Sequence, residues 1–318
     1  MVQQSTAAVS DVWNDQQQWS RAANRLKRGI RFWRNFALAF AILGAVLATA
    51  ATQVGLKTGW GQGLSIAAAV MLAVAPSIQK TKLSQGAIES WTRARSASEG
   101  LKAEIYLYLA GVAPYDGPKR DAELNKNANR ITRDVKDLAG HTLGLSGSSR
   151  PMPPVHDVDS YLRERVLDQI DDYYRRRAGE HQQSLTLFRR IEFTLGLLAV
   201  ALSAVAAATH IGGFSAWVAV VTTVAAAITS HIAAERYEHL VVSYMATASQ
   251  LEAIVRDWKA DDDKSAEAAA ALVQKCESVI SRENESWMAA WTSKDEKKEE
   301  EKDEVKEEGE NPQPATPD

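Results

Sequence analysis

The chain has 318 residues, of which 45% are hydrophobic, and its formal net charge of -3 excludes a nucleic-acid-binding protein with a basic surface. The single cysteine, Cys276, excludes an intrachain disulfide, and we interpret it as a small core residue in a reducing, cytoplasmic segment. The charges are distributed unevenly: Arg gathers beside long apolar blocks, and Lys and Glu fill the last stretch.

Two apolar blocks near the N-terminus form the first predicted hairpin. Residues 36–54 carry no charge over about the twenty residues that a helix needs to cross a bilayer. After a Gly-rich loop, residues 55–62, the block 63–78 is again uncharged and contains Pro76 near its end. The sequence therefore predicts two membrane spans joined by a short loop.

The second predicted hairpin consists of the apolar blocks 193–211 and 214–234, which are separated only by Gly212 and Gly213. Two glycines suffice for a tight turn between antiparallel helices. The alternative is a soluble bundle with buried helices, and the high Ala content of the blocks is compatible with it. Against it, the four blocks lack the polar stripe of a soluble helix. We therefore predict an all-α membrane protein with four transmembrane helices, arranged as two tandem helical hairpins with long cytoplasmic helical extensions.

Basic residues beside the apolar blocks set the predicted orientation. They precede the first span, follow the second and precede the third, whereas the hairpin loops contain only Lys57. Because positive residues are retained inside, both hairpins should enter from the cytoplasm and return to it. We expect a multi-pass protein of the plasma membrane with both termini in the cytoplasm. The flanking residues are Arg21, Arg25, Lys27, Arg28, Arg31, Arg34, Lys80, Lys82, Arg175, Arg176, Arg177, Arg189 and Arg190.

Two local matches indicate an internal duplication. Residues 32–34 match 188–190, and residues 101–103 match 251–253 at an offset six residues smaller. The shorter loop of the second hairpin accounts for the change in offset. We therefore predict a first module over 1–135, a linker rich in Gly, Ser and Pro over 136–158, a second module over 159–292, and a disordered Lys/Glu-rich tail over 293–318.

Small and apolar residues continue at heptad spacing beyond each second span, which predicts that each helix runs on into the cytoplasm. The helices that enter each hairpin are the expected partners of these stripes. A last amphipathic segment should fold back on the bundle. The stripes are Ala87, Trp91, Ala94, Ser98, Leu101, Ile105 and Tyr108, then Tyr237, Val241, Tyr244, Ala248, Leu251, Val255 and Trp258; the last segment contains Leu272, Cys276, Val279 and Trp287.

The sequence offers no catalytic constellation. No Gly-rich phosphate loop, no nucleophile with a base and no His/Cys group at metal spacing is present, so we predict a protein that is not an enzyme and has no cofactor. The spans instead carry small and hydroxyl residues that suit helix packing, either within a hairpin or between subunits around a pore. These candidates are Gly44, Ala48, Thr52, Pro76, Ala199, Ser203, Ala207, Thr222, Thr223 and Thr229.

Arg177, His181 and Ser184 form a predicted polar layer at inward positions of the helix that enters the second hairpin. Such a layer either senses pH or a ligand, or sets the register of the helices.

Both modules carry aromatic, Arg and Leu motifs around their hairpins. They are Tyr161-Leu162-x-x-Arg165, Gln169, Tyr173-Tyr174, Arg177-Ala178, Tyr237 and Leu251 in the second module, and Ser98-Glu99, Leu101-Lys102 and Glu104-Ile105-Tyr106-x-Tyr108 in the first. With these residues the second module resembles the SLATT family, the SMODS- and SLOG-associating two-transmembrane effector domains, and the first module is similar to another branch of it. Together the two modules would cover roughly residues 10 to 260.

The resemblance implies a prokaryotic membrane effector of conflict or defence systems that use nucleotide signals. Such an effector would oligomerise and perturb or permeabilise the lipid bilayer in response to a cytoplasmic signal. Its partners would be the bilayer, further copies of the chain, and a separate nucleotide-signal sensor or synthase. Two alternatives remain: a membrane-anchored scaffold that recruits partners through its tail, and a transporter. Because the predicted repeat is parallel and not inverted, the transporter is the weaker of the two.

Cysteine accessibility tests the predicted topology. In a Cys276→Ser background, single cysteines at Gly59 and Gly213 should react with an impermeant thiol reagent in intact cells, because both lie in the predicted outer loops. Single cysteines at Ser146 and Ser293 should react only after lysis. Labelling of all four positions only after lysis would show that the apolar blocks form a soluble core.

Overall fold

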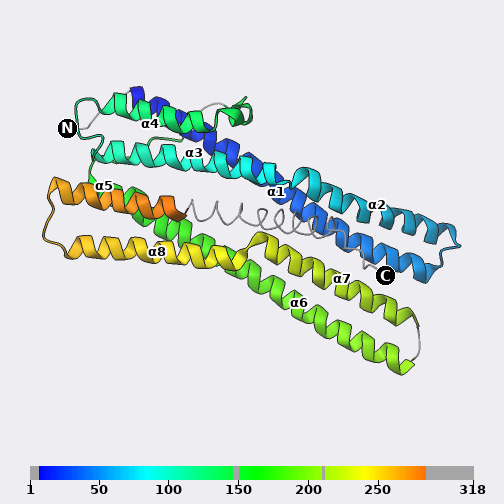
Figure 1. Cartoon of the computed structure of the whole chain (residues 1–318). Coiled ribbons are helices and arrows are strands. Elements are labelled where there is room, and N and C mark those ends of the chain that lie inside the picture. The colour runs from blue at the N-terminus through cyan, green and yellow to red at the C-terminus, as the bar shows by residue number, and fades with distance from the viewer. Residues whose placement is uncertain (1–6, 146–149, 210–211, 284–318) are drawn as a thin grey trace, which may run out of the picture.

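The computed structural model describes residues 7–145, 150–209 and 212–283 (Figure 1). Within these ranges the chain is helical without strands, and four helices are long and apolar enough to span a membrane, so the prediction of an all-α membrane protein is confirmed. The predicted tail 293–318 and Trp287 lie outside the described residues, as do residues 210–211 of the third span and 146–149 of the linker.

The first module is built on one very long helix. Its 48 residues correspond to about 70 Å, so the same helix belongs to both the apolar hairpin and the polar bundle (Figure 1). The next helix completes the hairpin, and two further helices cover the N-terminal half of the first. The elements are α1 (Ala7–Val54), α2 (Gly59–Lys82), α3 (Gln85–Ala110), α4 (Arg120–Asp134) and a 3-10 turn, η1 (Lys136–Thr142).

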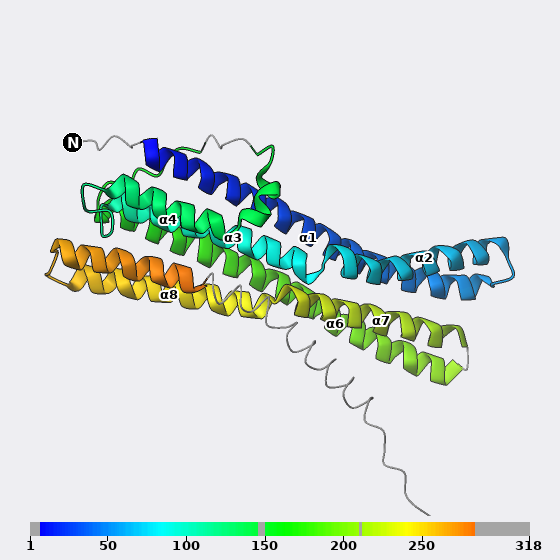
Figure 2. The ribbon, with the colours of Figure 1, turned by 45° about the horizontal axis from the view of Figure 1, so that its top comes forward.

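The second module follows the same plan (Figure 2). Its entering helix is continuous from residue 158 to 209 and contains two stretches of wider π-helical turns. A hairpin partner, a return helix and a final helix over residues 266–283 complete it. The elements are α5 (Val158–Tyr161), η2 (Leu162–Leu167), η3 (Gln169–Arg175), α6 (Arg176–Thr209), α7 (Gly212–Glu235) and α8 (Tyr237–Ala260).

Beyond each second span the chain runs on as a return helix, as predicted, after a local interruption. In the first module the helix stops at Leu83 and Ser84, because Ser84 adopts an extended backbone with φ −61° and ψ 156°. In the second module Arg236 adopts the left-handed conformation, with φ 53° and ψ 37°, which a residue with a Cβ rarely takes. Both breaks lie where an apolar hairpin meets the polar bundle, so the hairpins can be oriented independently of the return helices.

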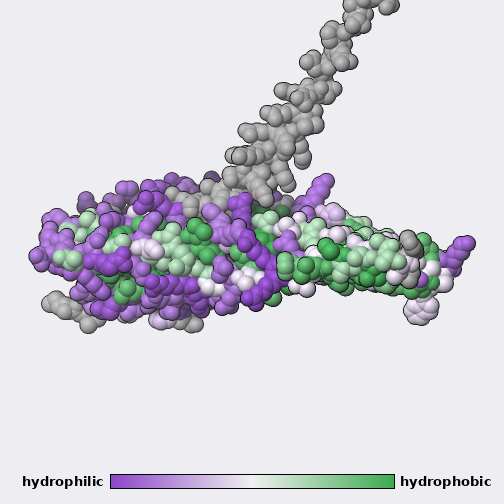
Figure 3. All heavy atoms as spheres, turned by 90° about the horizontal axis from the view of Figure 1, so that it is seen from below, coloured by the Kyte–Doolittle hydropathy of each residue, from purple (hydrophilic) through white to green (hydrophobic). Residues whose placement is uncertain are grey.

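The two ends of the elongated molecule differ in surface chemistry. Figure 3 shows apolar surface over the hairpins and polar surface over the bundle. Large apolar side chains of the hairpins are open to the surroundings, among them Phe193 at 69% and Val200 at 68% exposure. No residue in the apolar stretch of α6 is buried. This surface requires an apolar solvent, which the bilayer supplies.

The polar bundle has a conventional core. The two predicted heptad stripes contribute to it, and Leu101, Ile105 and Leu251 are completely buried. The helix 266–283 packs on the same core through Leu272, Cys276 and other apolar residues. Burial raises the pKa of the Cys276 thiol to about 12, which suits a core residue and leaves it unreactive.

A buried ion pair joins the final helix to the entering helix of the second module. Arg165 donates from Nε and Nη2 to the two carboxylate oxygens of Glu277, at 2.9 and 3.0 Å, and Tyr161 donates to the same carboxylate at 2.9 Å. Tyr106 of α3 stacks under the guanidinium at 4.7 Å. Burial opposes the charge on Arg165, but the carboxylate and its hydrogen bonds outweigh it and raise the pKa of the guanidinium.

Removing Arg165 should destabilise the bundle strongly. An Arg165→Ala variant leaves the Glu277 carboxylate buried without its counter-charge, for which we expect a loss of about 3–5 kcal/mol in the free energy of unfolding. The measurement is denaturant unfolding in detergent, followed by the fluorescence of the bundle tryptophans. Arg175→Ala is the matched control, because Arg175 pairs with Asp171 at 2.8 Å and with Glu252 on the exposed surface and should leave the midpoint near wild type.

Candidate functional site

The two hairpins pack side by side, and the seam between them is the candidate functional site. Helix α1 of the first module contacts α7 of the second along this seam (Figures 1 and 2). Near the hairpin tips, Gln53 donates to the backbone carbonyl of Gly213 at 3.4 Å. At the opposite end, Arg34 pairs with Glu235. Polar contacts therefore close both ends of an otherwise apolar interface.

The ion pair between Arg34 and Glu235 links the modules where the hairpins leave the bundle. The side chains lie 2.7 Å apart and are only 13% and 18% exposed. A partly buried pair stabilises only when both members are present, because either charge alone would remain poorly solvated. The pair therefore favours one register of α1 against α7.

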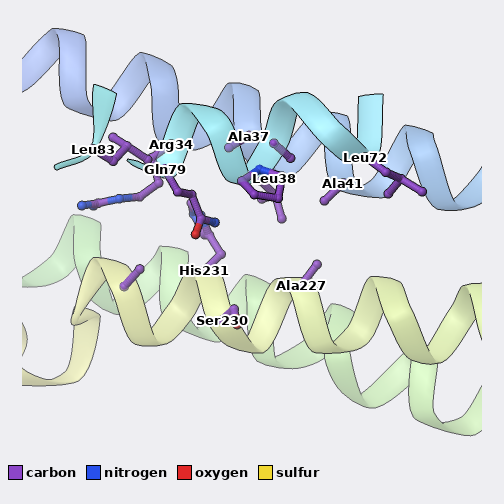
Figure 4. A pocket seen from close by; sticks show the side chains of 13 residues that line it. Arg34, Ala37, Leu38, Ala41, Leu72, Gln79, Leu83, Ala227, Ser230 and His231 are labelled. Atoms are coloured by element: carbon purple, nitrogen blue, oxygen red, sulfur yellow. The ribbon is translucent and has the colours of Figure 1, made fainter. Parts of the chain in front are cut away.

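Beside this pair lies a cavity of about 350 Å³, which we call the seam cavity (Figure 4). Small and apolar residues, chiefly from α1, α2 and α7, form most of its wall. The polar groups come from Arg34, Gln79, Ser230 and His231. Pro76, one of the residues predicted from the sequence, also lines it. His231 is nearly buried and packs on Phe188 with ring centroids 5.1 Å apart. The cavity thus combines an apolar wall with a polar end at the junction.

A second cavity of about 290 Å³, which we call the bundle cavity, lies between the modules inside the polar bundle. It is bounded by α1 and α3 on one side and by η3, α6, the end of α7 and α8 on the other, and Arg150 of the connecting segment also lines it. Two residues of the predicted polar layer, Arg177 and His181, line it. The third, Ser184, donates to the backbone carbonyl of Glu180 at 3.0 Å instead.

His181 packs between Tyr237 and Tyr244, with ring centroids 5.8 and 6.0 Å away. Burial, and then the positive charge of Lys27, lower the pKa of His181. The imidazole is therefore neutral at pH 7, and the positive charge at this cavity comes from Lys and Arg.

The first predicted ridge of small residues is divided by the structure. Gly44 is buried at the contact between α1 and α2, Ala48 is partly buried, and Thr52 is exposed with its hydroxyl bonded to the carbonyl of Thr49. The buried residues along this part of α1 are Ala37, Gly44 and Ala51, at a spacing of seven.

The second ridge and the threonines lie mainly on the outside. Ala199 is partly buried, whereas Ser203 and Ala207 are exposed on α6. Thr222 and Thr223 are exposed on α7 and bond to carbonyls of their own helix. Thr229 donates to Glu192 across the second hairpin. A role of these residues in subunit packing or in lining a pore stays a prediction.

Within the described ranges, no group of three or more His, Cys, Asp and Glu residues is placed to hold a metal ion. Sequence reasoning named Lys27 and Arg34 only as residues that set the orientation. It gave no site role to three further residues that line the two cavities: Arg95, His231 and Glu235. The available signal was the position of ionisable residues at the ends of the spans. The sequence could not pair them, because the partners are up to 201 residues apart.

Comparison with known families gives two matches. Residues 161–287 match the family described as SMODS and SLOG-associating 2TM effector domain 1. Residues 17–123 match a family described as protein of unknown function DUF4231. No curated protein and no solved structure gives a significant match. The two matched ranges each contain one hairpin and its return helix.

Substitution at Gly44 tests the packing of the first hairpin. A Cβ at Gly44 would lie 2.8 Å from Cγ of Leu72, so Gly44→Val should destabilise the protein by about 1–3 kcal/mol through overpacking. Gly196→Val is the control, because nothing lies within 4 Å of a Cβ at Gly196. Thermal unfolding in detergent compares the two variants, and equal midpoints would contradict the close approach of α1 and α2.

Proposed function

We propose, from the membership of residues 161–287 in the SMODS and SLOG-associating two-transmembrane effector family, that this protein assembles in the plasma membrane and permeabilises it in response to a cytoplasmic signal. The match of residues 161–287 supports a membrane effector. Oligomerisation, permeabilisation and the signal are our proposal. We infer cytoplasmic termini, because basic residues gather at the bundle end of the hairpins and Lys57 is the one basic residue in the predicted outer loops.

The observation that carries the proposal is the uncovered third span. In the other three spans, between 17% and 22% of the apolar stretch is buried inside the chain, whereas in α6 none of it is. One whole helix of the second hairpin therefore has surface available to other copies. Exposed Ser203 and Ala207 lie four residues apart on this helix, and small residues at that spacing let two transmembrane helices approach closely.

An assembly through α6 would also change which surface faces lipid. Helix α7 presents the exposed hydroxyl residues Thr222 and Thr223. In a ring of hairpins these hydroxyls would make one wall weakly polar. Such a wall would be more favourably exposed to water than to lipid. The spans carry no ionisable side chain near the midplane, which favours an unselective leak over a coupled pump.

Dye release from vesicles tests the proposal. Full-length protein reconstituted at rising protein-to-lipid ratios should release an entrapped dye, with a steep dependence on density, because assembly follows mass action even without the natural signal. A Ser203→Leu/Ala207→Leu variant should still insert but lose at least tenfold in release rate. Ala201→Leu is the matched control, since Ala201 is exposed on the opposite side of α6.

Inserted, folded protein that releases no dye at the highest density would overturn permeabilisation. Release that is equal in wild type and the double variant would overturn assembly through α6. The first result, together with intact membrane insertion, would favour the alternative of a membrane-anchored scaffold without pore activity.

A further inference from the structure

The bundle cavity is strongly cationic. Its wall contains six basic side chains and only two carboxylates, Glu99 and Glu235. The basic residues come from both modules and from the segment that connects them, so the positive charge is a property of the packed pair. They are Lys27, Arg31, Arg95, Lys102, Arg150 and Arg177.

The nearby carboxylates do not balance this charge. Glu235 pairs with Arg34, a further cation beside the cavity, and Glu99 lies 3.9 Å from Lys102. Glu180 pairs with Arg177 at the rim. Burial raises the pKa of Glu283, which faces Arg95 and Lys102 in the adjoining space, to about 7, so this group carries only part of a negative charge at neutral pH. A net positive charge therefore remains.

Lys27 lies close to other positive charges of the cavity wall. Desolvation, and then the guanidinium groups of Arg95 and Arg177, lower the pKa of Lys27 to about 8. Its ammonium group lies 5.7 Å from the ring of Trp91. Within the part of the chain that the structure describes, neither Lys27 nor Arg31 forms an ion pair with a carboxylate. A bound anion would reduce the repulsion between these cations, and their positive charge would attract the anion.

We propose that the bundle cavity binds a small, soluble anion that carries at least two phosphate groups. Guanidinium groups suit phosphate oxygens because they donate two parallel hydrogen bonds, and Arg supplies four of the six basic groups. The volume of about 290 Å³ lies at the small end of ligand cavities, which limits the size of the ligand. One phosphate would neutralise only part of the excess charge.

A phospholipid headgroup fits the cavity less well. The wall follows α1 from Arg31 back to Ser20, a distance of about 16 Å along the helix and away from the hairpins. Lys102 lies eleven residues beyond Trp91 on α3, at the far end of the same wall. A headgroup anchored in the bilayer would reach the hairpin end of the cavity but not this far end.

This ligand would be the cytoplasmic signal, a role that rests on the proposed function, whereas binding itself does not. Bound phosphates would bridge α1 and α3 of the first module to α6 of the second. The ion pair between Arg34 and Glu235 joins the same two modules at the hairpin end of the cavity. Ligand binding would therefore favour one packing of the two hairpins over another. A ligand can switch a protein only if it binds one conformation more tightly than the other.

Calorimetric titration of the full-length protein in detergent tests the site, with pyrophosphate and tripolyphosphate as probes and sulfate at equal ionic strength as reference. We expect one phosphate probe per chain, bound at least tenfold more tightly than sulfate. Lys27→Gln and Arg31→Gln should each weaken binding about tenfold or more. Arg189→Gln is the control, because Arg189 pairs with Glu238 on the exposed surface, away from the cavity, and should change affinity by less than twofold.

Two further measurements separate binding from folding and from lipid. Lys27→Gln should keep or raise the melting temperature of the ligand-free protein, since it removes a repelled cation; a loss of binding caused by unfolding would lower it. In nanodiscs, anionic phospholipid should not displace the probe. Three results would each overturn the proposal. They are a phosphate probe that binds no more tightly than sulfate, probe binding that Lys27→Gln and Arg31→Gln leave unchanged, and displacement of the probe by anionic lipid. A protein that binds the probe but releases no dye would keep the site and refute permeabilisation.

Discussion

Apolar surface that the chain leaves uncovered governs the whole architecture. Phe193 and Val200 project from a helix whose apolar stretch has no buried residue, and the other three spans are covered only in part. In lipid, every backbone polar group must be bonded within the segment, which restricts the spans to continuous helices. The helices that contain the spans are therefore interrupted only at the hairpin tips and at the junction with the bundle, as at Arg236, within the residues that the structure describes. Pro76 lies within α2, close to its bundle end.

The same restriction moves charge out of the hairpins and into the junction. Each module carries basic residues before its first span, as membrane orientation favours. When the modules pack side by side, these residues face one another: Lys27 and Arg31 from α1 meet Arg177 from α6. The cationic cavity is thus a physical consequence of packing two basic-flanked hairpins side by side in one chain. Glu235 balances one of the cations and joins the modules.

The polar bundle gives this arrangement a fixed frame. The pair of Arg165 and Glu277 brings the helix 266–283 onto η2, and Tyr161 and Tyr106 complete the surroundings of the charge. A buried ion pair contributes less net stability than an apolar replacement would, because both charges lose water. Its effect is on specificity, since no other register of the final helix would satisfy Arg165.

Sequence alone predicts the four spans, the pairing of spans into hairpins, the basic flanks and the apolar stripes that build the bundle core. Each of these depends on residues close together in the chain, where helical periodicity and the length of a bilayer crossing are sufficient constraints. Local motifs around Arg165 and Arg177 also indicated the similarity of residues 161–287 to a known effector family.

Which helix faces meet depends on tertiary packing. The sequence predicted that helix continues beyond each second span, but it did not reveal the local interruptions at Ser84 and Arg236, where each hairpin meets the bundle. It placed Gly44 and Thr52 on one ridge, whereas packing buries the first and exposes the second. It could not bring Arg34 to Glu235 or Lys27 to Arg177. Contacts between residues so far apart depend on the rotation of each helix about its axis, which side-chain packing across the whole molecule sets and local periodicity leaves free.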